Sequence, residues 1–244
     1  MKAVPSRSSP VLLEVHKINA GYGASQVLFD ISLAIHEQEV VSVLGRNGMG
    51  KSTLIKTLMG AIPPISGTLY FDGAPMHRLS PDAIARRGIA IVPEGRMCFP
   101  NLTVEEHLVA FATRRHAQDH PWTVSRIYEM FPRLQERAQH LGHQLSGGEQ
   151  QMLAIGRALS TNPKLLILDE ATEGLAPIVR EEIWHCLAQL RAAGQTILVV
   201  DKYVERLLEV ADRHLILEKG RIVWTGSSEQ LRDSRAVWNK YLSI

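Results

Sequence analysis

Short apolar runs typical of β-strands dominate the first third of the chain. Residues 11–15, 27–35 and 68–71 have the composition of strands, and they surround one very apolar run at residues 40–44. A glycine-rich segment follows this run directly, and residues 52–59 then have a helical pattern. The sequence therefore predicts a strand, a glycine-rich loop and a helix, in that order.

The middle of the chain has helical periodicity and no convincing strand. The predicted helices lie at residues 103–115, 124–138 and 150–159. Because this region stands between two regions that contain strands, it indicates a helical subdomain inserted into an otherwise mixed α and β structure.

Strands and helices alternate after Pro163. The predicted order is strand 165–168, helix 178–193, strand 196–200, helix 204–211 and strand 214–217. Strands that are apolar throughout and alternate with helices are typical of a parallel sheet that is covered on both faces. The run 222–224 follows the turn residues Lys219 and Gly220, so we expect it to pair with the preceding strand in an antiparallel manner.

Length, charge and cysteine content exclude several classes of protein. The 244 residues are enough for one large domain, or for one domain with an inserted subdomain. The net charge of +2 gives no electrostatic reason to expect nucleic-acid binding. Cys98 and Cys186 are too few for a disulfide framework or a metal site, so we expect both to be free thiols.

The lengths of the apolar segments indicate where in the cell the protein is expected. None approaches the roughly 20 apolar residues that a membrane-spanning helix needs. Residues 1–10 contain Pro5 and Pro10 but no apolar run, so we expect a flexible tail and not a secretory signal. These features predict a cytoplasmic protein.

The glycine-rich segment after the first very apolar strand matches the phosphate-binding P-loop pattern. In such a loop, glycines let backbone amides turn toward phosphate oxygens, and the following helix presents its positive end. Lys51 then reaches the β- and γ-phosphates, the Ser52 hydroxyl ligates Mg²⁺, and Thr53 is placed for a further phosphate contact. The segment reads Gly45, Arg46, Asn47, Gly48, Met49, Gly50, Lys51, Ser52.

Two acidic residues follow the apolar strand at 165–168. Asp169 and Glu170 have the form of a Walker B segment, although an apolar strand that ends in two acids can equally be a simple strand end. Together with a P-loop, the pattern favours a functional interpretation. Asp169 is then expected to hold the Mg²⁺ shell, and Glu170 to orient the attacking water and accept its proton.

A third motif lies at the start of the last helix of the middle region. Ser146 followed by Glu149 fits a helix capping box. The same hydroxyl, with the bare backbones of Gly147 and Gly148, also forms an exposed anion site at a helix N-terminus. Because this site has no lysine of its own, it is suited to clamp phosphates that another subunit holds. The full segment reads Leu145, Ser146, Gly147, Gly148, Glu149, Gln150, Gln151.

With these three motifs together, the chain resembles the ATP-binding-cassette (ABC) ATPases, in which residues 145–151 form the signature motif. The resemblance implies an α/β P-loop NTPase fold with a mostly parallel core sheet, an N-terminal antiparallel β subdomain and an inserted helical subdomain. It also implies one nucleotide-binding domain over residues 11–244. Its parts are a catalytic core at 11–95 and 160–244, and a helical subdomain with the signature motif at about 96–159.

The resemblance further implies ATP and Mg²⁺ as cofactors, and a head-to-tail dimer. Each ATP then lies between the P-loop of one subunit and Ser146, Gly147, Gly148 and Glu149 of its partner, so that two-fold symmetry gives two composite sites. Tyr22 matches the aromatic position that stacks on adenine, although it can also be a simple packing residue. Residues 173–177 match the D-loop, which crosses the dimer interface, and are otherwise a plain strand-to-helix turn.

Two positions depart from the general family pattern. Glu94 stands where most of these ATPases have a glutamine that senses both Mg²⁺ and the membrane subunit. Lys202 stands at the switch-histidine position, where its ammonium either stabilises charge on the γ-phosphate or is a solvated cation at the end of a strand. The segments around Glu94 and at 150–159 resemble the second ATPase subunit of branched-chain amino acid importers, and this likeness extends over about residues 13–242.

This likeness implies a motor for import of branched-chain amino acids, short amides or urea. The implied partners are integral membrane permeases, a second ABC ATPase that is a homologous chain or a second copy, and indirectly an external substrate-binding protein. The chain is then peripheral on the inner face of the cell membrane. The alternatives are the ATPase of a lipopolysaccharide-type exporter, which keeps the glutamine that Glu94 replaces, and a soluble cassette that acts on DNA or the ribosome.

Overall fold

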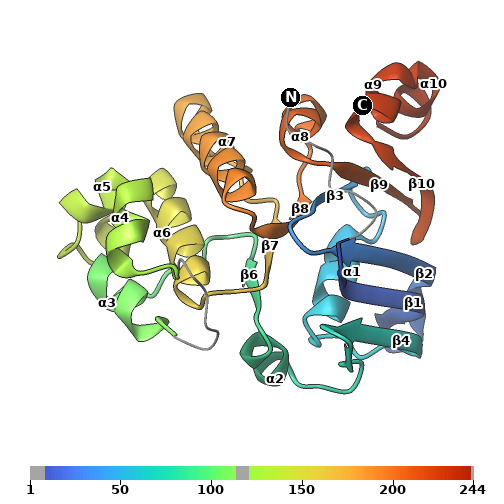
Figure 1. Ribbon diagram of the computed structural model, residues 1–244, viewed down its shortest axis with the longest axis horizontal. Helices are drawn as coiled ribbons and strands as arrows, with labels where there is room; N and C mark the ends of the chain where they lie inside the picture. The colour runs from blue at the N-terminus through green and yellow to red at the C-terminus, as the bar shows by residue number, and fades with distance from the viewer. Residues whose placement is uncertain (1–8, 114–120, 243–244) are drawn as a thin grey trace.

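A six-stranded sheet forms the centre of the computed structural model, which describes residues 9–113 and 121–242 (Figure 1). Its strands are β3 (Val40–Leu44), β6 (Ile89–Val92), β7 (Leu165–Asp169), β8 (Thr196–Val200), β9 (Arg213–Glu218) and β10 (Arg221–Ser227). The spatial order is β10, β9, β3, β8, β7, β6, and all neighbours are parallel except the antiparallel pair of β9 and β10. The predicted mostly parallel core sheet is therefore confirmed.

A second, antiparallel sheet lies beside the first. Its strands are β1 (Val11–Tyr22), β2 (Ser25–His36), β4 (Ser66–Phe71) and β5 (Ala74–Pro75), in the order β2, β1, β4, β5. Strand β1 is longer than the predicted run at 11–15, because the buried Ile18 and Ala20 continue the strand beyond the exposed His16 and Lys17. The expected N-terminal antiparallel sheet is confirmed. Residues 1–8 of the expected tail lie outside the described residues.

Four helices form a separate lobe, at the left of Figure 1. They are α3 (Val104–Ala110), α4 (Val124–Met130), α5 (Pro132–Glu136) and α6 (Gly147–Ser160), with a short 3₁₀ turn η1 at Gly142–Gln144. The prediction of one helix at 124–138 is wrong, because Phe131 leaves the helical region and Pro132 begins a new helix. Helix α3 ends before the predicted boundary, and residues 114 and 115 lie outside the described residues.

The remaining helices pack around the two sheets. They are α1 (Lys51–Leu58), α2 (Pro81–Arg86), α7 (Pro177–Ala192), α8 (Val204–Val210), α9 (Ser228–Asp233) and α10 (Arg235–Val237), followed by a π-helical turn η2 at Trp238–Leu242. The sequence pattern predicted α1, α7 and α8 to within one residue at each end. It missed α2, β6 and the elements after residue 227, which are short.

Alternate residues of the central strands enter two different hydrophobic cores. In β7, Leu166 and Leu168 join the core that contains α6 and α7, while Leu165 and Ile167 join the core that contains α1 and the antiparallel sheet. All four side chains are fully buried. A strand buried on both faces cannot shift by one residue without exchanging its two sets of contacts, so this packing fixes where each strand ends.

The strand ends matter because parallel strands finish at the same edge of a sheet. The glycine-rich loop follows β3, Glu94 follows β6, Asp169 and Glu170 end β7, and Lys202 follows β8. Ligands of open α/β sheets bind at this carboxyl edge. The fold therefore gathers polar segments that are far apart in the sequence.

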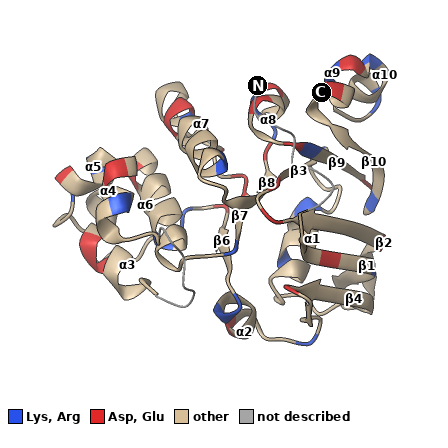
Figure 2. Ribbon diagram, in the orientation of Figure 1, with Lys and Arg blue, Asp and Glu red and all other residues tan. Residues whose placement is uncertain are grey.

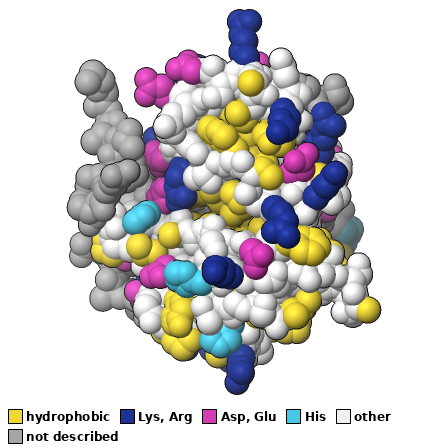
Figure 3. Space-filling model, turned by 90° about the vertical axis from the view of Figure 1, so that its right-hand side faces the viewer, with side chains coloured by type: hydrophobic (Ala, Val, Ile, Leu, Met, Phe, Trp, Pro, Cys, Tyr) yellow, Lys and Arg dark blue, Asp and Glu magenta, His cyan; other side chains and the backbone are white. Residues whose placement is uncertain are grey.

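The surface carries charges of both signs. Lys, Arg, Asp and Glu occur on helices of both lobes (Figure 2), and on the face toward the antiparallel sheet they are interspersed with hydrophobic side chains (Figure 3). In the described ranges, no helix has the length and apolar character needed to cross a bilayer.

His214 is a buried polar link in the central sheet. Its Nδ1 lies 2.6 Å from the Ser42 hydroxyl in β3, and its Nε2 lies 2.8 Å from the Ser228 hydroxyl at the start of α9. Burial lowers the pKa of His214 from 6.5 to about 4, because the charged imidazolium would lose its hydration. His214 is therefore neutral in the folded protein above that pH.

We predict that acidification destabilises the protein through His214. Between about pH 4 and 6.5 the unfolded state binds more protons at this residue than the folded state, so the free energy of unfolding falls as the pH falls, by about 2 kcal/mol from pH 7 to 5. Urea unfolding at both pH values measures this loss. His214→Gln should reduce the loss by about that amount, and an equal loss in the variant would contradict the assignment.

Candidate active site

The loop between β3 and α1 wraps around an open space at the edge of the central sheet. Gly45, Gly48 and Gly50 have φ angles of 144°, 78° and 105°, in the region that favours glycine. A Cβ atom on Gly45 would lie 2.3 Å from the Leu217 carbonyl oxygen, so the loop can only pass β9 with glycine at this position. The backbone geometry thus accounts for the glycines of the P-loop pattern.

Lys51 is held at the centre of this loop. Its ammonium donates to the carbonyl oxygens of Gly45 at 2.9 Å and Arg46 at 3.2 Å, and only 7% of the residue is exposed. Its Nζ also lies 3.9 Å from a carboxylate oxygen of Glu170. The two carbonyls hold the ammonium in place, so a cation lies where phosphate groups are expected to bind.

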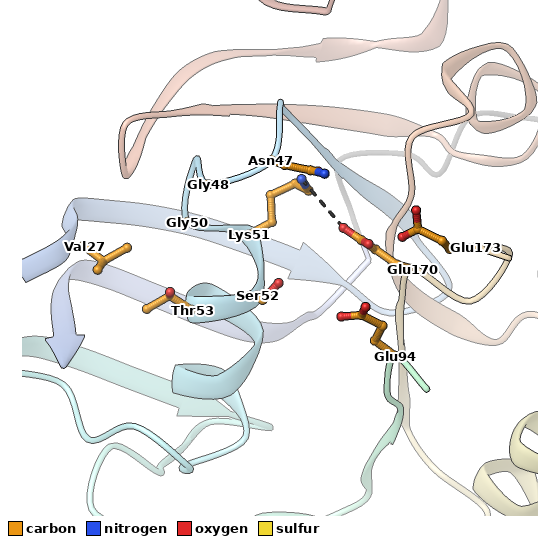
Figure 4. Close-up of a pocket in the computed structure, with 10 residues that line it drawn as sticks. All are labelled: Val27, Asn47, Gly48, Gly50, Lys51, Ser52, Thr53, Glu94, Glu170 and Glu173. Atoms are coloured by element: carbon orange, nitrogen blue, oxygen red, sulfur yellow. Dashed lines mark ion pairs between the residues drawn. The ribbon is translucent and has the colours of Figure 1, made fainter. Parts of the chain in front are cut away.

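A cavity of about 490 Å³ opens between the loop and the ends of β6 and β7. In Figure 4 the Lys51 ammonium points across this cavity toward Glu170, and Glu94 and Glu173 lie on the same side as Glu170. Ser52 and Thr53 line it from the start of α1. The complete lining is Val27, Asn47, Gly48, Gly50, Lys51, Ser52, Thr53, Glu94, Glu170 and Glu173.

Asp169 is a buried acid beside this cavity. Burial and the nearby Glu94 charge raise its pKa above the ordinary value, and Lys51 opposes the rise. Within the described part of the chain, its Oδ1 atom is buried and accepts no hydrogen bond. A buried carboxylate oxygen without a partner is unfavourable unless a cation or a water completes it.

Neighbouring residues determine both the backbone position of Glu170 and the pKa of its carboxyl group. Its φ angle of 51° is uncommon outside glycine, and its N–H donates to the Val200 carbonyl at 2.8 Å, which ties the end of β7 to β8. A hydrogen bond with Glu173, together with burial, raises the pKa of Glu170 to about 7. A carboxyl group with that pKa can exchange protons near neutral pH, as a general base must.

Glu173 connects Glu170 to Lys202. The Lys202 ammonium lies 2.7 Å from a Glu173 carboxylate oxygen, and this pairing raises the pKa of Lys202. The Lys202 side chain is 60% exposed and does not line the cavity. In this conformation, Lys202 acts on the cavity through Glu173, and whether it reaches a phosphate stays a prediction.

The residues of the cavity fit a divalent cation. Carboxylate oxygens of Glu94, Glu170 and Glu173 lie within 4.8 Å of one another, and the unpartnered Oδ1 of Asp169 is a further oxygen donor. Hard cations such as Mg²⁺ prefer such oxygen ligands. The predicted set of Ser52, Glu94 and Asp169 shares Glu94 with the three clustered carboxylates and Asp169 as the further donor, and it stays a prediction.

The signature segment lies at the start of α6 and does not line this cavity. Ser146 caps the helix: its hydroxyl accepts from the Glu149 N–H at 3.3 Å, and its own N–H donates to the Glu149 carboxylate at 2.7 Å. The predicted capping box is therefore confirmed. Gly148 packs against Val179 of α7, where a Cβ atom would come within 2.7 Å.

Tyr22 ends strand β1 and is 50% exposed. The Lys56 ammonium lies 5.9 Å from the centre of its ring. The ring is not packed into the core and does not line the cavity. An exposed aromatic face is free to stack on a planar base, and this role stays a prediction.

Sequence reasoning placed Glu173 at the start of the D-loop or of a plain turn and missed it as a residue that lines the cavity. It could have been found as the third acid within five residues, after Asp169 and Glu170. What the sequence did not contain was its pairing with Lys202, which is 29 positions away.

Comparisons with known proteins agree with the geometry. The family model described as ABC transporter matches residues 28–173. The high-affinity branched-chain amino acid transport ATP-binding protein BraG of Pseudomonas aeruginosa is 42% identical over 231 residues, which cover 95% of this chain and 99% of BraG. The probable branched-chain amino acid transport ATP-binding protein LivF of Archaeoglobus fulgidus is 35% identical over 221 residues, which cover 90% of this chain and 94% of LivF. A solved structure described as the ATP binding subunit of an ABC transporter has a TM-score of 0.80 and 28% identity, and the match covers 95% of this chain and 96% of that one.

We predict that Lys51→Ala removes most of the affinity for ATP, because Lys51 is the one Lys or Arg among the described residues that line the cavity. Titration calorimetry measures the affinity. Lys240→Ala, an exposed lysine in the C-terminal turn, is the matched control and should bind ATP normally. Equal affinities for the two variants would show that the cavity is not the phosphate site.

Proposed function

The chain belongs to the ABC transporter family of ATPases, and we propose that it is one ATP-hydrolysing subunit of an importer for branched-chain amino acids or related amides. Members of this family bind and hydrolyse ATP as subunits of membrane transporters, and this chain is such an ATPase. The observation that carries the proposal is the arrangement of Lys51 opposite Glu170 across one cavity at the carboxyl edge of the parallel sheet.

Each residue of the cavity has a proposed task in hydrolysis. Lys51 neutralises the β- and γ-phosphates, and the amides of the loop from Gly45 to Gly50 bind phosphate oxygens. Glu170 orients the attacking water and accepts its proton, for which its raised pKa is suited. Ser52, Glu94 and Asp169 hold Mg²⁺, which when bound neutralises charge on the phosphates. Tyr22 stacks on the adenine ring.

We assign the signature segment to the ATP of a second cassette. The segment from Ser146 to Glu149 does not line the cavity of its own chain. Its exposed helix N-terminus is suited to bind phosphates from the side that the P-loop leaves open. The proposed active form is therefore a head-to-tail pair with a homologous chain or a second copy, in which residues 11–95 and 160–244 form the core and 96–159 the helical subdomain.

A groove between the core and the helical lobe is the proposed contact with the permease. It has a volume of about 540 Å³ and lies between α2, β6, the end of α3 and α6. Met97 and Phe99, which are 66% and 47% exposed, line it. Two large apolar side chains exposed side by side favour a protein partner. Because Glu94 directly precedes this segment, movement in the groove can reach the cavity.

The substrate is inferred from the relatives. BraG and LivF are named for branched-chain amino acid transport, and we extend this to the present chain, with short amides and urea as the remaining candidates. Glu94 favours this group over lipopolysaccharide export, since that group keeps glutamine at this position. An external binding protein and the permease select the molecule that is carried, so the cassette supplies only the ATP-driven motion.

We predict that Glu170→Gln retains ATP binding and lowers turnover by roughly 10²-fold or more, because an amide cannot accept the proton. In membrane vesicles that contain the complete transporter, ATP-dependent uptake of labelled leucine should be lost in parallel. Glu229→Gln, at an exposed acid of α9, should leave both rates unchanged. Near-normal turnover in Glu170→Gln would mean that another group is the base, and turnover without leucine uptake in the wild type would contradict the substrate.

We predict that Lys202→Met lowers turnover by about tenfold or more and weakens ATP binding much less, as expected for a contact that strengthens in the transition state. Lys202→His should restore part of the rate. Lys164→Met is the matched control, because Lys164 also pairs with an acid, Asp72, but lies away from the cavity. Single-turnover hydrolysis in the assembled transporter is the measurement. Identical rates for wild type and Lys202→Met would show that Lys202 does not contribute to hydrolysis.

A further inference from the structure

The cavity is short of positive charge for a nucleoside triphosphate. Of the described residues that line it, Lys51 is the one cation, whereas Glu94, Glu170 and Glu173 are acids. Lys202, which follows β8, is paired with Glu173. A γ-phosphate in this cavity therefore faces carboxylates on one side. The proposed Mg²⁺ offsets part of this negative charge, and any side-chain cation in addition to Lys51 has to come from a residue that does not line the cavity.

The signature segment does not contain that cation. Residues 146–149 include no Lys or Arg, and Glu149 adds a negative charge. The Arg137 guanidinium lies 3.5 Å from the Glu149 carboxylate and so is already engaged with it. The helix N-terminus alone offers only the partial charge of its amides.

Arg96 lies directly against this segment. A Cβ atom built on Gly147 would be 2.5 Å from Arg96 Nη1 and 2.9 Å from Arg96 Cζ. The guanidinium therefore rests on the bare backbone of Gly147, and a side chain at that position would displace it. Its Nη2 is also 4.0 Å from the position of a Cβ on Gly174, in the turn between β7 and α7.

The backbone holds Arg96 firmly to the helical lobe. Gly95, Arg96 and Met97 have φ angles of 84°, 64° and 46°, which form a tight turn after Glu94. Beyond the turn, Arg157 of α6 donates to the Met97 carbonyl at 2.8 Å, and the Phe99 N–H donates to His107 of α3 at 2.9 Å. The segment after Arg96 is thus tied to α3 and to α6, the helix that begins with the signature segment.

Among the described residues, the Arg96 guanidinium has no acidic partner. Over residues 9–113 and 121–242, its guanidinium forms no hydrogen bond and no ion pair, although it is half-buried. It is also not part of the lining of the cavity of its own chain. A half-buried guanidinium without an acidic partner is unfavourable unless an anion joins it.

We propose that Arg96 contacts the γ-phosphate of ATP held by a second copy of this chain, and so supplies the cation that the signature segment lacks. This inference rests on the proposed ATP-bridged pair of cassettes. A guanidinium can donate two parallel hydrogen bonds to phosphate oxygens, which the amides of α6 complement from the helix axis. Arg96 is then a phosphate-binding residue that acts in trans.

The test uses the full chain with Glu170→Gln, which we predict to hold ATP and to hydrolyse it slowly, and light scattering with ATP and Mg²⁺. Arg96→Met in this background should need at least about tenfold more protein to form dimers, because a charge-assisted contact is lost at each ATP. Arg96→Lys, which keeps the charge but not the two parallel donors, should recover part of the affinity. Arg232→Met, an exposed arginine of α9, is the matched control and should dimerise normally. Calorimetry should give one ATP affinity for all the monomers.

Mixing two inactive chains tests the action in trans. Lys51→Ala keeps Arg96 but cannot hold ATP, and Arg96→Met keeps its P-loop. The mixture should regain hydrolysis, because one of its two sites combines an intact P-loop with an intact Arg96. No recovery would overturn the action in trans.

The outcomes separate the inference from the function on which it rests. If the Glu170→Gln chain itself forms no dimer with ATP, the ATP-bridged pair is wrong and the role of Arg96 is wrong with it. If that chain dimerises and Arg96→Met dimerises equally well, only the role of Arg96 is overturned. If Arg96→Lys recovers nothing over Arg96→Met, charge at this position does not stabilise the dimer and the proposed phosphate contact is overturned. Melting temperatures confirm that each variant is folded.

Discussion

The burial of both faces of the six-stranded sheet determines where the chemistry of this protein can occur. Because alternate side chains of β7 belong to two separate cores, the strand cannot slide, and the acids at its end have one position. The same holds for β3 and the glycine-rich loop that follows it. Everything in the site depends on this constraint, since the loop and the acids come from strands that are separated by β8.

The site itself combines fixed positions with unsatisfied charge. Lys51 is held by two backbone carbonyls, while Asp169 has a buried oxygen without a partner and Glu170 has a raised pKa. The unpartnered oxygen and the crowded carboxylates cost free energy without a ligand, and bound phosphates and a cation would offset this cost. Arg96, which lies two positions after Glu94, and the start of α6 have the opposite imbalance, a positive charge with no acidic partner among the described residues. The two halves are complementary, and this supports the ATP-bridged pair.

The parts of the fold and the site that could be predicted from the sequence are those that a short continuous segment determines. The P-loop, the apolar strand ending in Asp169 and Glu170, and the capping box at Ser146 each depend on neighbours within a few positions. The missed features depend on distant contacts or on short elements. The pairing of Glu173 with Lys202 and the packing of Arg96 on Gly147 join segments that only the folded chain brings together. The break at Pro132 is a different kind of error, because it depends on a local signal. The proline indicated a helix start, but the helical periodicity on both sides of it led to the prediction of one continuous helix.

The central claim is that this chain contributes half of each ATP site and needs a second cassette for the other half. A structure of the Glu170→Gln chain with ATP and Mg²⁺ tests it most directly. The account predicts two chains related by a two-fold axis, with each γ-phosphate between Lys51 of one chain and the segment Ser146 to Gly148 of the other. A monomer whose ATP phosphates are enclosed by one chain alone would contradict it.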